Sequence, residues 1–185
     1  RNSFIETLNF LLNNKKKFGN NFNNEKITKT IIDLKKKNSK KIQFIYSSLV
    51  HYSSFINLFE TRKIRNIAAK ILKTNPNNLI ISEHQFRIDY PNDLNHILDW
   101  HQDSVYYPQD KNGRNSLVCN ISLHKITKDM GATILLPKSH RKGSLKFKIK
   151  KGSLTKSGQR KTTGKLYHLT PTSIETDVGD ITLYH

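Results

Sequence analysis

A histidine and an aspartate two residues apart, His101 and Asp103, are the residues of this sequence best suited to hold a metal ion. They lie in the segment 98–107, LDWHQDSVYY, where apolar and polar residues alternate as in a β-strand. Residues two apart on a strand point to the same face, so the imidazole and the carboxylate would lie side by side. They would supply two of the three ligands of the facial triad that holds non-haem Fe(II) and leaves coordination positions open.

The His–Asp pair alone is weak evidence, because an ordinary surface ion pair on a strand has the same spacing. Two later segments favour the metal interpretation. Residues 129–141, DMGATILLPKSHR, read as a turn, a buried strand and a turn led by proline. Residues 178–185, VGDITLYH, read as a Gly-Asp turn that enters a half-buried strand.

In this order, the three segments resemble the phytanoyl-CoA dioxygenase-like family of Fe(II)- and 2-oxoglutarate-dependent oxygenases. Trp100-His101-Gln102-Asp103 is similar to the metal-binding segment of that family. Residues 130–141 are similar to its Gly-Ala to Pro-Gly-Ser-His-Arg segment, with Lys138 where glycine is common. Residues 179–185 are similar to its Gly-Asp, aliphatic, aromatic, His strand, so the resemblance covers residues 80–185.

The resemblance implies a double-stranded β-helix, the cupin-like jelly roll, in which His101 and Asp103 are the first two iron ligands. It places the third ligand, a histidine, a few residues beyond His185, and the 2-oxoglutarate-binding arginine further on. His185 itself is the other candidate for the third ligand. Because the chain begins at Arg1 and stops at His185 after an apolar run, we expect both ends to be cut. A fragment without the third ligand would be inactive by itself.

The implied reaction couples the oxidative decarboxylation of 2-oxoglutarate to the oxidation of a substrate C–H bond. A halogenase on this scaffold leaves the carboxylate position vacant for halide, and Asp103 fills it. We therefore expect hydroxylation of a small organic or acyl substrate. Two alternatives stay open: a jelly-roll module that binds metal or isomerises a substrate without 2-oxoglutarate chemistry, and a basic nucleic-acid-binding domain.

Three residues are candidate cosubstrate contacts: Arg87, Gln102 and Tyr107. Arg87 lies on the strand predicted before the metal pair, where its guanidinium would bind a carboxylate through two hydrogen bonds; the alternative is an edge-strand arginine facing water. Gln102 and Tyr107 flank the pair, but Gln102 alternates away from it on an ideal strand, so only a distorted strand end would bring its amide to the metal side. The remaining histidines are interpreted as structural: His51, His84, His96, His124, His140 and His168.

The elements that must position these residues change type along the chain. Apolar residues at helical spacing predict helices over 4–12, 27–34, 44–59 and 64–71. After the break at Asn75-Pro76 the period becomes two, which predicts strands at 80–90, 97–107, 116–123, 132–136, 166–169 and 178–184. We predict one mainly β domain over 1–185, with N-terminal helices (1–74) and a jelly-roll part (79–185) that is incomplete at its C-terminus.

The 32 basic and 14 acidic residues give a net charge of +18, which suits nucleic acid, anionic lipid or acidic substrates. Lys outnumbers Arg 25 to 7. Because Arg is the better bidentate phosphate ligand, this ratio favours a drift in overall composition over a selected phosphate-binding surface. Basic residues gather over 141–165, which we predict to be a mobile loop or a hairpin excursion. Its one aromatic residue is Phe147, whereas single-stranded nucleic acid is held by several aromatics among basic residues. We therefore expect a small-molecule substrate, and an anionic one is compatible with the basic charge.

The remaining features of the composition concern the cellular location of the protein. The sequence has no run of eighteen or more apolar residues and no signal segment at its start, so we expect neither a membrane span nor export. A single cysteine, Cys119, cannot form an internal disulfide, and its apolar neighbours predict that it is buried. We expect a cytoplasmic location.

Overall fold

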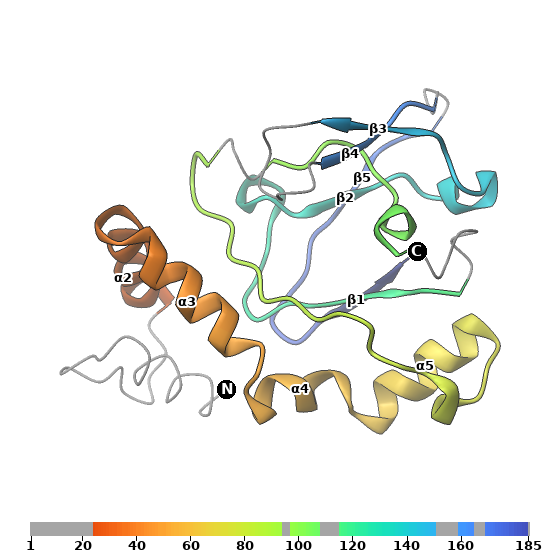
Figure 1. The fold of residues 1–185 in the computed structure, drawn as a ribbon, viewed down its shortest axis with the longest axis horizontal. Helices are drawn as coiled ribbons and strands as arrows, with labels where there is room; N and C mark the ends of the chain where they lie inside the picture. Colours follow the sequence, from red (N-terminus) through yellow and green to blue (C-terminus); the bar gives the residue numbers. More distant parts are fainter. Residues whose placement is uncertain (1–23, 94–96, 108–114, 151–158, 165–168, 185) are drawn as a thin grey trace. The chain divides into compact units, whose positions relative to one another are not determined.

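The computed structural model describes residues 24–93, 97–107, 115–150, 159–164 and 169–184 (Figure 1). The chain divides into two compact units. The first comprises Arg1–Ile67 and Asn75–Tyr90, and the second comprises Ala68–Thr74 and Pro91–His185. The two units are described separately. Among the described residues, no helix combines the length and the apolar character needed to cross a lipid bilayer.

Helices make up most of the described residues of the first unit. They are α2 (Asn24–Lys37), α3 (Ser39–Leu49), α4 (Ser53–Phe59) and the greater part of α5 (Arg62–Leu72). The single helix predicted over 44–59 is wrong, because the backbone turns between α3 and α4, with a hydrogen bond from the N–H of Tyr52 to the carbonyl of Leu49 at 3.3 Å. The helix predicted over 4–12 lies outside the described residues.

The core of the first unit lies between α2, α3 and the extended segment 80–90. Its buried side chains are Ile31, Ile42, Ile45 and Leu49, and Phe86, Ile88 and Tyr90 pack against them. Residues 83–90 alternate between exposed and half-buried, as a strand does. They are not part of a sheet in the described structure: apolar side chains of this segment pack on the helices, and Tyr46 Oη donates to the carbonyl of Ile88 at 3.3 Å.

The described residues of the second unit form three antiparallel pairs of strands; Figure 1 shows how these strands lie within the unit. They are β1 (Val118–Ile121) with β6 (Ile181–Tyr184), β2 (Thr133–Leu135) with β5 (Thr172–Ile174), and β3 (Phe147–Lys150) with β4 (Gln159–Thr162). The predicted strands at 116–123, 132–136 and 178–184 contain β1, β2 and β6. These pairs agree with a mainly antiparallel β architecture, but the described residues do not close into a barrel, so the jelly roll remains an expectation.

Two parts of the second unit differ from the sequence predictions. Residues 97–107 are not a strand: they are irregular up to Gln102, and Asp103–Tyr106 form a 3-10 helix. The basic segment 141–165 contains the β3–β4 hairpin, which agrees with the predicted hairpin excursion. The predicted strand 166–169 lies outside the described residues except for Leu169.

The loss of the strand at 97–107 has a physical cause in the β3–β4 hairpin. In an antiparallel pair, every second N–H group of an outer strand points away from its partner. On β4, the N–H of Thr162 donates to the carbonyl of Trp100 at 2.7 Å, and the N–H of Arg160 donates to Oη of Tyr106 at 2.9 Å. The second of these acceptors is a side chain, so the segment covers the edge of β4 without adding a regular strand to it.

Candidate metal centre

His101 and Asp103 lie side by side, although the strand predicted to bring them together is absent. Nε2 of His101 is 3.2 Å from Oδ1 of Asp103, and the two side chains are 22% and 29% exposed. The irregular backbone at 101–102 leads directly into the 3-10 helix that begins at Asp103. The change from irregular backbone to a 3-10 helix, and not the alternation of a strand, therefore places the two groups side by side.

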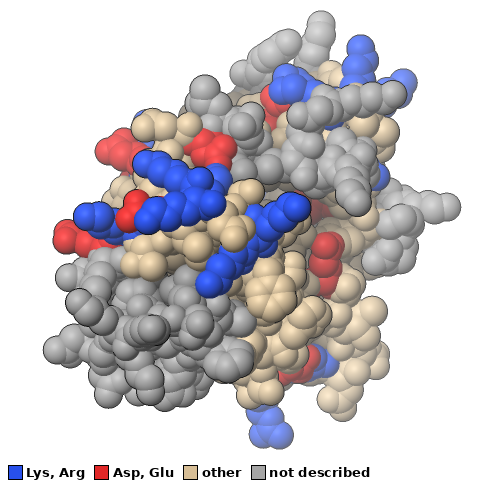
Figure 2. Space-filling model, turned by 60° about the vertical axis from the view of Figure 1, so that its left-hand side comes forward, with Lys and Arg blue, Asp and Glu red and all other residues tan. Residues whose placement is uncertain are grey.

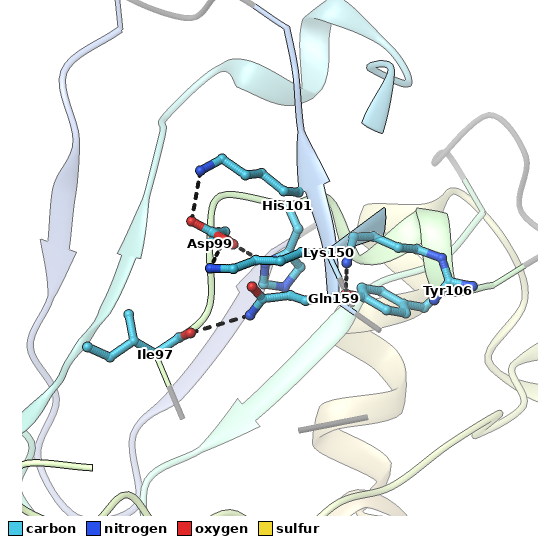
Figure 3. A network of polar contacts seen from close by, with 8 residues as sticks. Ile97, Asp99, His101, Tyr106, Lys150 and Gln159 are labelled. Atoms are coloured by element: carbon cyan, nitrogen blue, oxygen red, sulfur yellow. Dashed lines mark hydrogen bonds and ion pairs between the residues drawn. The ribbon is translucent and has the colours of Figure 1, made fainter. Parts of the chain in front are cut away.

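The hydrogen bond on the other side of the imidazole fixes its tautomer. Nδ1 of His101 lies 2.7 Å from the backbone carbonyl of Asp99 (Figure 3). A carbonyl oxygen only accepts, so Nδ1 carries a proton, and a ring without a second proton presents a lone pair at Nε2. Lone pairs of Nε2 and of the Asp103 carboxylate then meet at 3.2 Å. That arrangement needs a positive centre, either a proton on the ring or a metal ion.

The separation of the pair fits a metal ion. Two adjacent ligands of an octahedral ion, each bonded at about 2.1 Å, lie about 3.0 Å apart. The 3.2 Å between Nε2 of His101 and Oδ1 of Asp103 is close to that value. A histidine held by a backbone carbonyl through its other nitrogen is also the usual outer arrangement of a metal ligand. The residues present therefore fit two of the three expected ligands.

A third protein ligand is not found within the part of the chain that the structure describes. No group of three or more His, Cys, Asp or Glu side chains among these residues could hold a metal ion. His185, the candidate within the sequence, lies outside the described residues. The third ligand, at His185 or beyond it, stays a prediction.

Asp99 is the polar centre of the surroundings of His101 (Figure 3). Its Oδ1 accepts from Nζ of Lys161 at 3.0 Å, and its Oδ2 accepts from Nζ of Lys150 at 3.1 Å. These two hydrogen bonds hold the pKa of the Asp99 carboxyl below its usual value. Both lysines belong to the β3–β4 hairpin, so the basic hairpin is bound to the metal-pair segment through this carboxylate.

The amide of Gln159, which is 4% exposed, completes the surroundings of Asp99. In one orientation its Nε2 donates to the carbonyl of Ile97 at 3.4 Å, as Figure 3 shows. With the amide oxygen and nitrogen exchanged, it donates to Oδ2 of Asp99 at 3.1 Å and accepts from the Asp99 N–H at 3.3 Å. The exchanged orientation satisfies both ends of a buried amide, so it is the favoured one.

Tyr106 links His101 to β4 through its ring and its hydroxyl. The rings of His101 and Tyr106 meet edge to face, with centroids 5.9 Å apart. The guanidinium carbon of Arg160 lies 4.5 Å from the centre of the same tyrosine ring, and the Arg160 N–H donates to Tyr106 Oη. The neighbouring Tyr107, a predicted cosubstrate contact, is half-buried and donates its N–H to the carbonyl of Ser104 at 3.1 Å.

The two other predicted cosubstrate contacts have partners within the chain. The amide of Gln102 donates to the carbonyl of Gly143 at 2.9 Å and accepts from the N–H of Leu145 at 2.7 Å. Arg87 belongs to the first unit, where its Nε donates to both carboxylate oxygens of Asp89, at 2.8 Å and 3.0 Å. The structure does not assign either side chain to a cosubstrate.

The other histidines differ from His101 in their surroundings. His51 and His84 meet edge to face with ring centroids 6.5 Å apart, and Nδ1 of His124 lies 2.6 Å from the carbonyl of Lys125. His140 is exposed in the 3-10 helix Ser139–Lys142. His96 and His168 lie outside the described residues.

Sequence reasoning missed the residues around the pair, namely Asp99, Tyr106, Lys150, Gln159 and Lys161. Asp99 could have been predicted from the sequence, because period-two spacing places it on the same face of a strand as His101 and Asp103. The lysines carried no local signal, since the Asp99–Lys150 and Asp99–Lys161 contacts span 51 and 62 residues.

The basic charge does not form one uninterrupted surface on the face that Figure 2 shows, where acidic and uncharged side chains lie among the Lys and Arg side chains. In the β3–β4 hairpin, two lysines pair with Asp99 and Phe147 is the one described aromatic side chain, 41% exposed. A groove that stacks successive bases needs several such aromatics. The arrangement therefore does not favour the nucleic-acid alternative.

The sequence was compared with protein families, curated proteins and solved structures. Residues 17–185 match the family model described as phytanoyl-CoA dioxygenase. No curated protein and no solved structure matches the chain. The matched residues include the His101–Asp103 pair and both strands of the hairpin that binds Asp99, and the match agrees with the resemblance that the three sequence segments carry.

Proposed function

Because the chain belongs to the phytanoyl-CoA dioxygenase family, we propose that it is a non-haem Fe(II)- and 2-oxoglutarate-dependent dioxygenase of a small organic or acyl substrate. The observation that carries the proposal is the 3.2 Å separation between Nε2 of His101 and Oδ1 of Asp103. Iron bound there would supply the open coordination positions at which 2-oxoglutarate and O2 react.

In this proposal His101 binds iron through Nε2 and Asp103 through its carboxylate. The support for Nε2 is the hydrogen bond from Nδ1 to the carbonyl of Asp99, which leaves Nε2 as the basic nitrogen. The third histidine ligand, at His185 or beyond it, remains a prediction. So do the 2-oxoglutarate contacts of Arg87, Gln102 and Tyr107. The double-stranded β-helix expected of the family also remains a prediction.

Asp103 bears on the type of oxidation. A carboxylate ligand occupies the position that halide takes in a halogenase of this scaffold, so the proposed outcome is hydroxylation. The ring of Tyr106 packs edge to face against the imidazole of His101, with ring centroids 5.9 Å apart. A site closed to water would strengthen the electrostatic interactions of the ligands and limit side reactions.

The proposed substrate is a small molecule, and an anionic one suits the basic charge of the β3–β4 hairpin, which binds Asp99 through Lys150 and Lys161. Lys146 and Lys148 of the second unit are exposed, on and next to β3. Exposed ammonium groups attract carboxylate and phosphate over distances of about a Debye length, roughly 8 Å at physiological ionic strength. The cytoplasmic location also stays a prediction.

The direct test is 2-oxoglutarate turnover to succinate by the full-length protein with Fe(II). We expect turnover in the wild type and none above background in Asp103→Ala. Asp129→Ala is the matched control, because Asp129 is exposed in the 3-10 helix Lys128–Met130, away in sequence from the metal pair. Binding of Fe(II) without succinate formation would instead favour a jelly-roll metal-binding or isomerase module.

A further inference from the structure

We infer that Asp99 is a positioning residue, and that the β3–β4 hairpin uses its carboxylate to fix the carbonyl that orients the imidazole of His101. The inference deepens the proposed function and rests on it where metal affinity is concerned. It also gives the basic segment 141–165 a role beyond a solvated insertion: two of its lysines set the geometry of a residue proposed to bind iron.

The carboxylate of Asp99 is held from both strands of the hairpin. Lys150 comes from β3 and Lys161 from β4, and each ammonium group binds a different carboxylate oxygen, at 3.1 Å and 3.0 Å. The buried Gln159 amide, the register partner of Lys150, lies against the same residue. Opposed partners on both oxygens prevent free rotation of the carboxylate.

The backbone on the C-terminal side of Asp99 is held as well. The N–H of Thr162 donates to the carbonyl of Trp100 at 2.7 Å, and the N–H of Arg160 donates to Oη of Tyr106 at 2.9 Å. The hairpin therefore binds the segment before and after His101. The remaining freedom lies in the peptide between Asp99 and Trp100, which carries the carbonyl that His101 contacts.

One hydrogen bond couples the orientation of the His101 imidazole to the position of that carbonyl. Nδ1 of His101 donates to it at 2.7 Å, which fixes both the rotation of the ring and the nitrogen that carries the proton. Loss of an outer partner of a metal ligand typically weakens metal binding by about 10–100-fold. Displacing the Asp99 carbonyl should therefore weaken binding at Nε2 without touching a ligand atom.

The chain provides a matched control for the lysines. Lys148 lies opposite Lys161 in the register of the hairpin and is exposed. It shares strand, charge and side-chain length with Lys150, and neither of the two lysine contacts to Asp99 involves it. Lys148→Met therefore removes the same charge and the same side-chain type from the same hairpin.

The experiment compares four forms of the full-length protein: wild type, Lys150→Met/Lys161→Met, Lys150→Arg/Lys161→Arg and Lys148→Met. The first readout is the signal of the His101 Nδ1–H proton in the ¹H–¹⁵N spectrum of metal-free protein, which reports the hydrogen bond to the Asp99 carbonyl in either protonation state of Nε2. The second readout is Co(II) affinity by calorimetry. Thermal unfolding reports whether each variant is folded.

We expect the wild type and Lys148→Met to show a slowly exchanging Nδ1–H proton. The double Met variant should lose this signal and bind Co(II) about 10–100-fold more weakly. The double Arg variant, which keeps both charges and both donors, should restore the wild-type signal. A double Met variant that is folded and keeps the wild-type Nδ1–H signal would overturn the inference. If the wild type itself fails to bind Co(II), the proposed function fails, and the Nδ1–H signal still decides the role of Asp99.

Discussion

Nε2 of His101 lies 3.2 Å from Oδ1 of Asp103, and the backbone between them bends from an irregular segment into a 3-10 helix. Two explanations of this contact require opposite protonation states of the His101 ring. An ordinary ion pair of this kind contributes about 0–1 kcal/mol to stability and needs a protonated ring. A metal site needs the neutral ring and gains its energy from the ion.

Asp103→Asn separates the two explanations, because it keeps the shape of the side chain and removes its charge. We expect Co(II) affinity of the full-length protein to fall by at least about tenfold, since losing an outer partner alone costs about 10–100-fold. Under the ion-pair explanation, Co(II) affinity would instead stay the same, and the free energy of unfolding of the metal-free protein would fall by up to about 1 kcal/mol. Calorimetric titration and urea denaturation measure the two quantities. The metal interpretation fails if stability drops while Co(II) affinity stays the same.

Gln102→Ala should destabilise the second unit. The Gln102 amide bonds the carbonyl of Gly143 and the N–H of Leu145, so the alanine variant removes the partner of two backbone groups at once. A loss of about 1–3 kcal/mol in the free energy of unfolding is expected by urea denaturation. Gln85→Ala is the control, because that amide is exposed and bonds Glu83. Equal stabilities for the two variants would contradict this role of Gln102.

Alkaline pH should weaken the first unit through Tyr46. Burial and the hydrogen bond with Tyr90 raise the pKa of the Tyr46 phenol above its ordinary range. In the unfolded chain this phenol loses its proton near pH 10, whereas the folded chain keeps it, so stability falls as pH rises above about 10. Urea denaturation between about pH 9 and pH 11 should show a steeper loss in the wild type than in Tyr46→Phe. Parallel losses in both proteins would contradict the prediction.

Alkylation of Cys119 should be slow and shifted to high pH. Cys119 was predicted to be buried but is half-buried in β1, and this partial burial raises the pKa of its thiol, which lowers the fraction of reactive thiolate. The rate of reaction with iodoacetamide should therefore reach half its maximum above about pH 8.5 in the folded protein, and return to that value in urea. Because the chain has one cysteine, mass spectrometry follows it without interference. Equal pH profiles in the folded and unfolded protein would show that burial has no such effect.

The local pattern of the sequence predicted the elements that depend on nearby residues. Helical spacing located α3, α4 and α5, and alternation located β1, β2 and β6, because both periodicities follow from backbone geometry. The break at 50–52 was missed, since an apolar stripe continues across it. The segment 97–107 was misassigned for a related reason: alternation reports which face is buried and does not report whether a neighbouring strand is present.

The sequence by itself determined the family of the chain and the two candidate ligands, because His101 and Asp103 are identified by residue type, spacing and the downstream segments 129–141 and 178–185. Only the tertiary structure decided how the pair is held. The Asp99 carboxylate meets Lys150 and Lys161 across 51 and 62 residues, and no periodicity encodes a contact at that separation. The hairpin edge packs on the segment 97–106 through contacts that span more than 50 residues, and the backbone there turns into a 3-10 helix that leaves Nε2 of His101 facing Asp103.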